Sequence, residues 1–392
     1  MSVAKLCECL SAADSSIVCR SSLVDHTNNE QQTTNNEITV YTTLANGKDE
    51  LPYPAGTVKQ VDGVEVHYFK RLTKDHSHFS PALYWKLWRT AKDFDIIHIH
   101  AWWNLVSIFS LMIALLKGKK VVFTPRGTLS SYSFNNRTSV AKKLFHQYIG
   151  KPLLKKCYIH TTSKREEKDI KELLNPKYVK TIPNLVELPW QQSSALLAQH
   201  QAFNGTLKLI FLSRVEQKKG LELLFDILAK ADFPYHLEIA GTGNENYITE
   251  LKALSKDLGI AEHITWLGML HKDEKFIQLA RNDLFVLPSY DENFANVVIE
   301  SLFAGTPVWI TENVGLSDYV SEKNLGWVCQ RTEEDLAMKL YEAYERISKN
   351  EIDRTDLQKT IEEDFKETNI TKKYLEMYTN LSSRGNERSL KH

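Results

Sequence analysis

Residues 284–310, LFVLPSYDENFANVVIESLFAGTPVWI, decide the fold of this chain. An apolar run from Leu284 to Pro288 leads into a polar loop and a helical pattern, and a second apolar run, Thr306 to Ile310, follows without slack. This order of strand, loop, helix and strand is typical of a βαβ unit, in which the two strands are parallel. We therefore predict an α/β protein whose ligands bind at the carboxyl ends of parallel strands.

Apolar runs alternate with helical patterns along most of the chain, which predicts further βαβ units. The other predicted strands are residues 38–43, 96–100, 120–124, 157–161, 207–213, 235–240 and 263–267, with a hairpin over 58–69. Because 392 residues exceed one ordinary core, we predict two Rossmann-like domains with a cleft between them. The predicted division is an N-terminal domain 1–185, a linker 186–206, a C-terminal domain 207–356, a helix 357–380 that packs back toward the first domain, and a polar tail 381–392.

The composition is that of a globular protein without a strong net charge. Lys and Arg number 49, as do Asp and Glu, and this balance argues against nucleic-acid binding. The five cysteines are scattered and form no C-x-x-C pair, so we predict no disulfide framework, no zinc site and a reducing compartment. The longest apolar run, Leu105 to Leu116, is shorter than the ~20 residues that span a bilayer, so we predict a buried helix. The first residues lack a signal peptide's apolar core, and we expect a cytoplasmic protein.

One part of the first domain is strongly basic. No Asp or Glu occurs between Ile96 and Arg165, and the lysines and arginines of that stretch cluster in residues 117–165. Two interpretations stay open: a solvated helix surface, or attraction to anionic membrane lipids or to a phosphate-bearing acceptor. Apolar residues among the lysines of 140–154 fit a helix on a membrane surface and equally fit an ordinary amphipathic core helix.

Two strand ends of the second domain carry residues suited to an anion. Arg214 and Lys219 follow the first strand of that domain and can reach a diphosphate, the arginine as a planar fork and the lysine as a point charge. A basic pair in a loop is more often a surface feature. Gly241 and Gly243 follow the next strand and either let the backbone approach a ligand or simply form a turn. They lack the third glycine of a dinucleotide-binding motif.

A third strand end, inside the stretch quoted first, carries two carboxylates. Glu292 lies in the loop, and Glu300 lies eight residues later, which leaves the two ~80° apart on a helix. Both can face one cleft, and the backbone N–H groups of residues 294–297 point into the space between them. Glu300 is either a surface residue or, because its neighbours are apolar, a buried carboxylate that needs a partner.

These motifs, taken in order, resemble the retaining glycosyltransferases of family 4, which have the GT-B fold of two facing Rossmann-like domains. In the second domain the resemblance rests on residues 213–220, the Gly241-Thr242-Gly243 turn, Trp266-Leu267-Gly268, the two glutamates with seven residues between them, and Gly305-Thr306-Pro307. In the first domain, residues 95–100, Trp103, Pro125-Arg126-Gly127 and residues 163–166 resemble the subgroup that builds bacterial cell-surface polysaccharides.

The resemblance implies transfer of a sugar from a nucleotide-diphosphate sugar to a glycan or lipid-linked acceptor, with retention of anomeric configuration and with no metal or cofactor. It assigns Glu292, Arg214 and Lys219 to catalysis and Glu300 to the donor ribose. The other implied substrate-binding residues are Asn293, Phe294, Ala295 and Asn296 at the transferred sugar, Gly241, Gly243 and Leu270 around the nucleotide, and Arg126 and His100 in the first domain.

The chain departs from the family pattern at three places. Ala295 replaces a glycine, and Arg126 stands where relatives have a histidine that touches the sugar. The first domain also lacks the family's N-terminal strand and Gly-rich loop, and residues 16–23 are the candidate substitute for the strand. Two alternatives therefore stay open: an impaired, truncated relative that only binds nucleotide, and a sugar-nucleotide 2-epimerase. Donor sugar, base, acceptor and linkage depend on pocket shape, and no motif assigns them.

Overall fold

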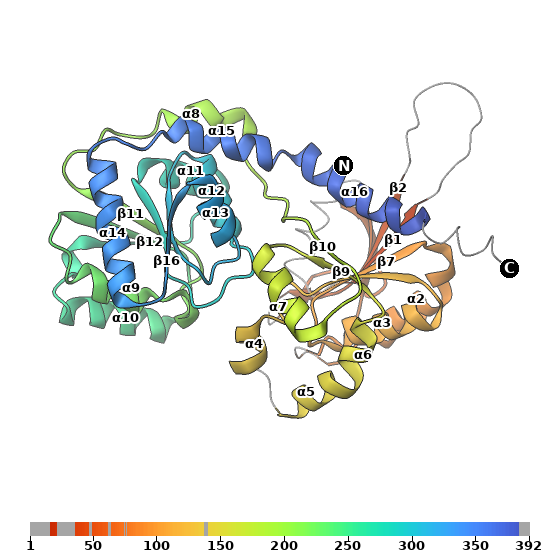
Figure 1. Cartoon of the computed structure of the whole chain (residues 1–392). Coiled ribbons are helices and arrows are strands. Elements are labelled where there is room, and N and C mark those ends of the chain that lie inside the picture. Colours follow the sequence, from red (N-terminus) through yellow and green to blue (C-terminus); the bar gives the residue numbers. More distant parts are fainter. Residues whose placement is uncertain are drawn as a thin grey trace, which may run out of the picture. The chain divides into compact units, whose positions relative to one another are not determined.

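The computed structural model describes residues 16–21, 36–46, 49–61, 64–73, 75, 77–136 and 140–383, and the predicted tail 381–392 lies mostly outside them. The chain forms two compact units (Figure 1): unit 1 is Met1–Leu185 with Glu367–His392, and unit 2 is Val186–Lys366. Where the sequence predicts one helix over 357–380, the structure has two, α15 (Arg354–Asp364) and α16 (Glu367–Ser383). The chain therefore passes from unit 2 back to unit 1 between these helices.

Unit 1 is built on a mixed eight-stranded sheet. Its order is β10 (Val179–Thr181), β9 (Tyr158–Thr161), β8 (Lys120–Thr124), β7 (Ile96–His100), β1 (Ser16–Ser21), β2 (Asn36–Thr43), β6 (Val64–Phe69) and β5 (Val58–Val61). β1 is antiparallel to both of its neighbours, and β5 is antiparallel to β6, which confirms the predicted hairpin. The remaining pairs are parallel.

The central position of this sheet corrects one expectation. The sequence predicts a first domain of parallel strands that lacks its N-terminal strand, with residues 16–23 as the candidate substitute. β1 forms within those residues and lies between β7 and β2, but it is antiparallel to both. It pairs Ser16 with Ile99 on one side and with Tyr41 on the other. An antiparallel strand satisfies the backbone groups of both neighbours, so the centre of the sheet has no unpaired edge.

Apolar residues cover both faces of the sheet of unit 1. Ile97 and Ile99 belong to one buried cluster and Ile96 to the other, as the alternation of side chains along a strand requires. The first cluster is covered by α2 (Pro81–Thr90), α3 (Leu105–Leu116), α6 (Lys151–Leu154) and α7 (Lys164–Leu174). The second is covered by α16 (Figure 1), and the buried helix predicted for 105–116 is confirmed as α3.

The other elements of unit 1 are short. They are β3 (Ala45–Asn46), β4 (Asp49–Glu50), η1 (Ala91–Asp93), α4 (Ser131–Asn136), α5 (Val140–Phe145) and the single π turn η2 (His146–Gly150).

Unit 2 contains a parallel six-stranded sheet. Its order is β13 (Ile264–Gly268), β12 (Tyr235–Ala240), β11 (Leu207–Leu212), β14 (Leu284–Leu287), β15 (Val308–Thr311) and β16 (Gly326–Cys329). The first five match predicted strands to within two residues, whereas the four-residue β16 was not predicted, because its sequence GWVC is too short to show alternation. The chain builds outward from β11 in one direction and from β14 in the other, so the sheet changes direction between these two strands.

Helices cover both faces of the unit 2 sheet and bury its strands. They are η4 (Gln217–Lys219), α9 (Leu221–Leu228), α10 (Glu245–Asp257), η5 (Ala261–His263), α11 (Lys272–Arg281), α12 (Asn296–Phe303), α13 (Ser317–Lys323), α14 (Glu333–Ser348) and α15. Residues 186–206, predicted as a linker, instead form η3 (Trp190–Gln192) and α8 (Ser193–Leu197) and pack on this unit. Leu188 and Leu196 join its core, and the Gln358 side chain donates to the Ser193 carbonyl at 2.9 Å.

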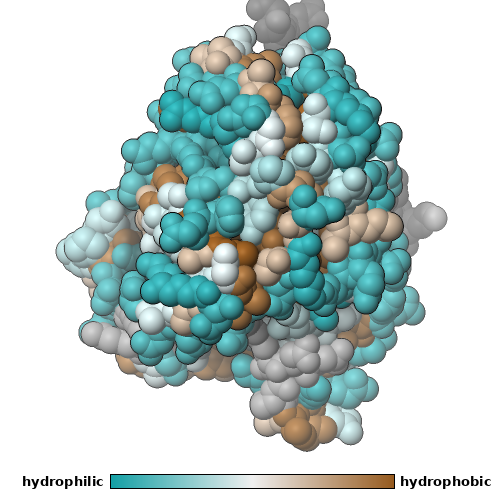
Figure 2. All heavy atoms as spheres, turned by 90° about the vertical axis from the view of Figure 1, so that its left-hand side faces the viewer, coloured by the Kyte–Doolittle hydropathy of each residue, from teal (hydrophilic) through white to brown (hydrophobic). Residues whose placement is uncertain are grey.

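Exposed apolar side chains are unevenly distributed between the units. Figure 2 shows the outer face over α9, α10 and α14 of unit 2, which is mostly hydrophilic with small hydrophobic areas between. Of the thirteen large exposed hydrophobic residues in the described ranges, ten belong to unit 1 and only Met269, Met338 and Tyr341 to unit 2. No helix within the described ranges has the length and hydropathy of a membrane span.

Candidate active site

The change of direction between β11 and β14 positions the site of unit 2. In open parallel sheets, the loops that leave two such strands diverge to opposite faces and leave a crevice at their carboxyl ends. Here those loops are residues 213–220, after β11, and residues 288–295, after β14. Both were predicted to bind the donor.

An ion pair joins these two loops. The Lys219 Nζ donates a hydrogen bond to the Glu292 carboxylate, and Ser289 Oγ lies 3.5 Å from the same carboxylate oxygen. The Lys219 side chain is 7% exposed and that of Glu292 is 13% exposed, so the pair is largely removed from water. Burial lowers the pKa of Lys219, and the charge of Glu292 opposes that shift. The structure therefore brings together two of the four principal predicted residues.

Close backbone packing holds the two loops in place. The Tyr290 N–H donates to the Lys218 carbonyl at 2.8 Å. Gly220 has a φ of +73°, and a Cβ there would lie 2.3 Å from the Pro288 carbonyl oxygen. Only glycine fits this contact, which places Lys219 directly beside the end of β14.

The backbone of Glu292 is anchored on its other side by the loop after β15. Its N–H donates to Asn313 at 3.0 Å, and its carbonyl accepts from Gly315 at 2.9 Å. Ala295 then begins α12 with a φ of +68° and gives the helix no side-chain cap. Glycine adopts this left-handed conformation without the steric cost that the Cβ of Ala295 incurs.

Glu300 is buried and has the partner that its apolar surroundings require. Its side chain is 11% exposed and accepts a hydrogen bond from Lys275 of α11 at 2.7 Å. Lys275 was not predicted from the sequence, in which the need of a buried carboxylate for a cation was the only signal.

Arg214 does not join the Lys219–Glu292 pair. Its side chain is 69% exposed and forms an ion pair with Glu216 at 2.7 Å. The four predicted residues thus belong to three separate ion pairs, although Arg214 and Lys219 share one loop.

The glycines after β12 have a packing role that accounts for them. A Cβ on Gly241 would lie 1.8 Å from the Ser213 carbonyl oxygen, and one on Gly243 would lie 2.0 Å from that of Val215. The loop after β12 therefore rests directly on the loop after β11, which favours the structural reading of these glycines.

The remaining predicted residues of unit 2 differ in what they can offer a ligand. The Phe294 side chain is buried against the ring of Phe365, so only its backbone is available. Asn293 and Asn296 are half-buried on either side of it, and Leu270 is half-buried after β13.

Arg126 and His100 meet at the carboxyl edge of the unit 1 sheet. His100 ends β7, and Arg126 follows β8 with a φ of +54°. The Arg126 Nε donates to His100 Nδ1 at 3.3 Å, and its Nη1 donates to Asn184 Oδ1 at 2.7 Å. The structure thus joins the two residues that the resemblance implies for this domain.

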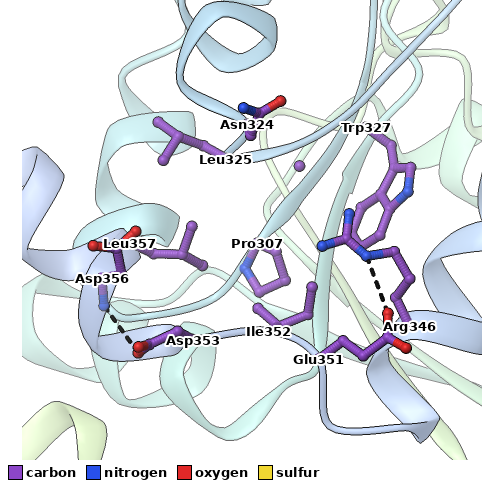
Figure 3. A pocket seen from close by; sticks show the side chains of 11 residues that line it. Pro307, Asn324, Leu325, Trp327, Arg346, Glu351, Ile352, Asp353, Asp356 and Leu357 are labelled. Atoms are coloured by element: carbon purple, nitrogen blue, oxygen red, sulfur yellow. Dashed lines mark hydrogen bonds and ion pairs between the residues drawn. The ribbon is translucent and has the colours of Figure 1, made fainter.

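A cavity of about 200 Å³ lies at the other edge of the unit 2 sheet, near the amino ends of β15 and β16 (Figure 3). Trp327, Ile352 and Leu357 contribute apolar walls to it, while Arg346 forms an ion pair with Glu351 at 3.6 Å. None of the predicted site residues lines this cavity. Among the described residues, no group of three or more His, Cys, Asp or Glu side chains is placed to hold a metal ion.

Two α/β units of this topology, with cationic and acidic residues at the strand ends, are those of the GT-B fold. Two family profiles match the chain: Glycosyltransferase Family 4 over residues 23–189 and Glycosyl transferases group 1 over residues 193–364. The chain belongs to the family 4 glycosyltransferases.

Relatives of known sequence agree with this assignment. An uncharacterised 41.2 kDa protein in the cps region of Klebsiella pneumoniae is 22% identical over 69% of this chain and 75% of its own length. An uncharacterised glycosyltransferase of Methanocaldococcus jannaschii is 21% identical over 83% of this chain and 87% of its own length.

Solved structures share the fold. Anabaena HepE in complex with UDP and glucose is 17% identical, with a TM-score of 0.62 over 81% of this chain and 87% of its own. Sucrose-phosphate synthase from Thermosynechococcus elongatus is 15% identical, with a TM-score of 0.67 over 88% of this chain and 89% of its own.

Proposed function

We propose that this glycosyltransferase moves a sugar from a nucleotide-diphosphate sugar to a glycan or lipid-linked acceptor of a cell-surface polysaccharide, with retention of configuration. The observation that carries the proposal is the Lys219–Glu292 pair at the point where the unit 2 sheet changes direction. A cation lies there beside a carboxylate that can accept hydrogen bonds from hydroxyl groups, at the edge of the sheet where ligands bind.

Lys219 and Arg214 bind the donor diphosphate in this proposal. As the glycosidic bond breaks, negative charge grows on the leaving diphosphate, and fixed cations lower the energy of that transition state. Arg214 is exposed and bound only to Glu216 in its own loop, so its guanidinium can turn to a phosphate at small cost. Glu292 then accepts hydrogen bonds from hydroxyls of the transferred sugar.

Glu300 accepts hydrogen bonds from the ribose hydroxyls of the nucleotide in this proposal. Lys275 holds the carboxylate in place and balances its charge. The backbone N–H groups of residues 293–296 hold sugar hydroxyls, and Leu270, with the backbone at Gly241 and Gly243, borders the nucleotide. The acceptor attacks an oxocarbenium-like species on the face that the diphosphate leaves.

The named relatives support this substrate class. HepE was crystallised with UDP and glucose, and the similar protein of Klebsiella pneumoniae is encoded in a cps region. A third relative, 30% identical over 36% of this chain, is an alpha-monoglucosyldiacylglycerol synthase of Streptococcus pneumoniae.

The test is release of nucleoside diphosphate from a panel of sugar nucleotides by the purified chain. We expect Lys219→Met to lower the rate about 100-fold or more, because it removes the cation that stabilises the charge on the leaving diphosphate in the transition state. Lys218→Met, which removes the neighbouring lysine, is the matched control and should keep most of the rate. If no sugar nucleotide is cleaved while nucleotide still binds, the chain is the binding-only alternative; an isomerised sugar nucleotide formed without acceptor would identify the epimerase.

We also propose that the protein works in the cytoplasm at the inner face of the membrane, through the basic region 117–165. Val140, Leu144 and Tyr148 are spaced four residues apart and are 74%, 53% and 75% exposed. An apolar stripe at helical spacing that faces water among lysines favours the membrane interpretation over an ordinary core helix.

A further inference from the structure

Arg126 is a half-buried cation with an incomplete set of partners. Two of its guanidinium nitrogens donate to neutral acceptors, His100 and Asn184. Its third nitrogen, Nη2, is buried and has no hydrogen-bond partner. Among the residues that the structure describes, no carboxylate forms an ion pair with Arg126.

The nearby carboxylate of Glu166 cannot fill this role. One of its oxygens accepts from the Gly127 N–H at 2.8 Å, and the other accepts from the N–H and hydroxyl of Thr162 at 2.8 and 3.0 Å. Glu166 is therefore engaged in holding the loop after β8. That loop keeps Arg126 in a left-handed conformation, a strain of the order of 1–2 kcal/mol for a residue with a side chain.

His100 has a second buried donor beside this guanidinium. Because a guanidinium only donates, the His100 Nδ1 that faces Arg126 must be the acceptor, and the ring proton lies on Nε2. His100 Nε2 is also buried without a hydrogen-bond partner. Burial lowers the pKa of His100 well below its ordinary value, and the Arg126 charge lowers it further, so the ring remains a neutral Nε2–H donor.

Two buried donors without acceptors are costly, at about 1–3 kcal/mol each. Both belong to residues at the carboxyl edge of the sheet, where parallel sheets bind ligands. The chain from residue 96 to residue 165 contains no Asp or Glu, and the adjacent Glu166 carboxylate is held by Gly127 and Thr162.

We propose that Arg126 Nη2 and His100 Nε2 bind an anionic group of a substrate, a phosphate or a carboxylate. The inference rests on the proposed glycosyltransferase function and deepens it, since it gives unit 1 an acidic substrate. The anionic group belongs either to the donor or to the acceptor. Arg126 Nη2 supplies a charged donor of the kind that phosphates and carboxylates accept, and His100 Nε2 supplies a neutral one.

The experiment measures binding to the full chain by calorimetry with three probes: UDP, inorganic phosphate and glucuronate. The variants are Arg126→Met, Arg126→Lys and the control Lys155→Met, which removes an exposed charge of the same basic region. A donor-borne anion predicts that Arg126→Met weakens UDP binding about 10- to 100-fold. An acceptor-borne anion predicts that phosphate or glucuronate binds the UDP-saturated wild type and that this binding is lost in Arg126→Met, with UDP affinity unchanged.

Arg126→Lys should recover part of the lost affinity because it keeps the charge, and thermal unfolding of each variant checks the fold. The proposal is overturned if folded Arg126→Met binds all three probes as the wild type does, or if Lys155→Met causes the same loss. Lys219→Met separates this outcome from the proposed function. An effect of Lys219→Met on UDP without any effect of Arg126→Met removes only the unit 1 anion site, and the reverse pattern removes only the unit 2 donor site.

Discussion

Lys219 is a lysine with 5% of its surface exposed, and one carboxylate balances its charge. At the scale of the residue, this arrangement gives the proposed donor site a preformed cation at a cost in stability. Removing water from a charge is unfavourable, which is why burial lowers the Lys219 pKa. The pair therefore contributes to the site more than to folding.

Glu292→Gln should destabilise the chain by about 3–5 kcal/mol, because it leaves the Lys219 charge buried and unpaired. The double variant Lys219→Met with Glu292→Gln should recover most of that loss, since it leaves no charge to compensate. Urea unfolding of the wild type, both single variants and the double variant measures the coupling. Additive effects of the two substitutions would show that the pair has no energetic coupling.

Ala295→Gly should stabilise unit 2 by up to about 1 kcal/mol, because glycine adopts the left-handed conformation of residue 295 without steric cost. Ala337→Gly is the matched control: this exposed alanine lies inside α14, where glycine costs about 1 kcal/mol. Thermal unfolding should therefore move in opposite directions for the same chemical change. Equal losses in the two variants would contradict the strain at Ala295.

At the scale of the element, buried hydrogen bonds tie α16 to three strands of unit 1. His160 Nε2 donates to the Ile182 carbonyl at 3.0 Å, so its Nδ1 accepts from Thr124 at 2.8 Å. Thr124 then accepts from His98 Nε2 at 2.6 Å, and His98 Nδ1 accepts from Tyr378 of α16 at 2.6 Å. The Ile182 carbonyl thus determines which atom is the donor in each hydrogen bond of this network.

Tyr378→Phe should cost about 1–3 kcal/mol, because it leaves His98 Nδ1 buried without a donor. Relative to the wild type, amide hydrogen exchange in this variant should accelerate in α16 more than in the helices of unit 2. Tyr341→Phe is the control, since Tyr341 is 48% exposed on α14 and should change neither quantity. Unchanged exchange in α16 of folded Tyr378→Phe would show that the hydroxyl does not hold the helix.

Acid should destabilise unit 1 through three buried histidines, His98, His100 and His160. Burial lowers the pKa of His98 and His100 well below 6.5 and that of His160 to about 3. Between these values and pH 6.5 the unfolded chain binds more protons, so stability falls as pH falls, by about 1.4 kcal/mol per pH unit for each histidine. Glu166 opposes this trend, because burial raises its pKa and the folded state takes up its proton first.

Urea unfolding from pH 7 to pH 5 measures this dependence, with tryptophan fluorescence as the signal. Stability that stays constant or rises over that interval would mean that the three histidines are already protonated in the folded protein.

At the scale of the whole molecule, the membrane contact proposed above would use the exposed apolar surface of unit 1. The double variant Leu144→Ser with Tyr148→Ser should weaken binding to anionic lipid vesicles about 10-fold or more, since each side chain loses apolar area that the bilayer would bury. The control is Met338→Ser with Tyr341→Ser on unit 2, where the same kind of side chains are 56% and 48% exposed. Added salt should weaken binding of the wild type. Equal binding by both double variants would exclude the stripe of Val140, Leu144 and Tyr148 as the contact.

Strands could be predicted from the sequence more completely than contacts between distant segments. Strands such as β7, β8 and β12 were predicted residue for residue, because alternation and apolar runs are local properties of the chain. The need of Glu300 for a partner was also predictable from its apolar neighbours. The identity of that partner, Lys275, was not, since it depends on how α11 packs against α12.

The sequence by itself determined two α/β units, most of their strands, and the loops that carry Lys219 and Glu292. Only the tertiary structure decided that β1 fills the centre of the first sheet in antiparallel orientation, that residues 186–206 pack on unit 2, and that Arg126 and His100 each keep one donor without an acceptor. The reason is physical: local patterns reflect the covalent neighbours of a residue, whereas these features depend on contacts between segments far apart in the chain, whose energies only the packed molecule sums.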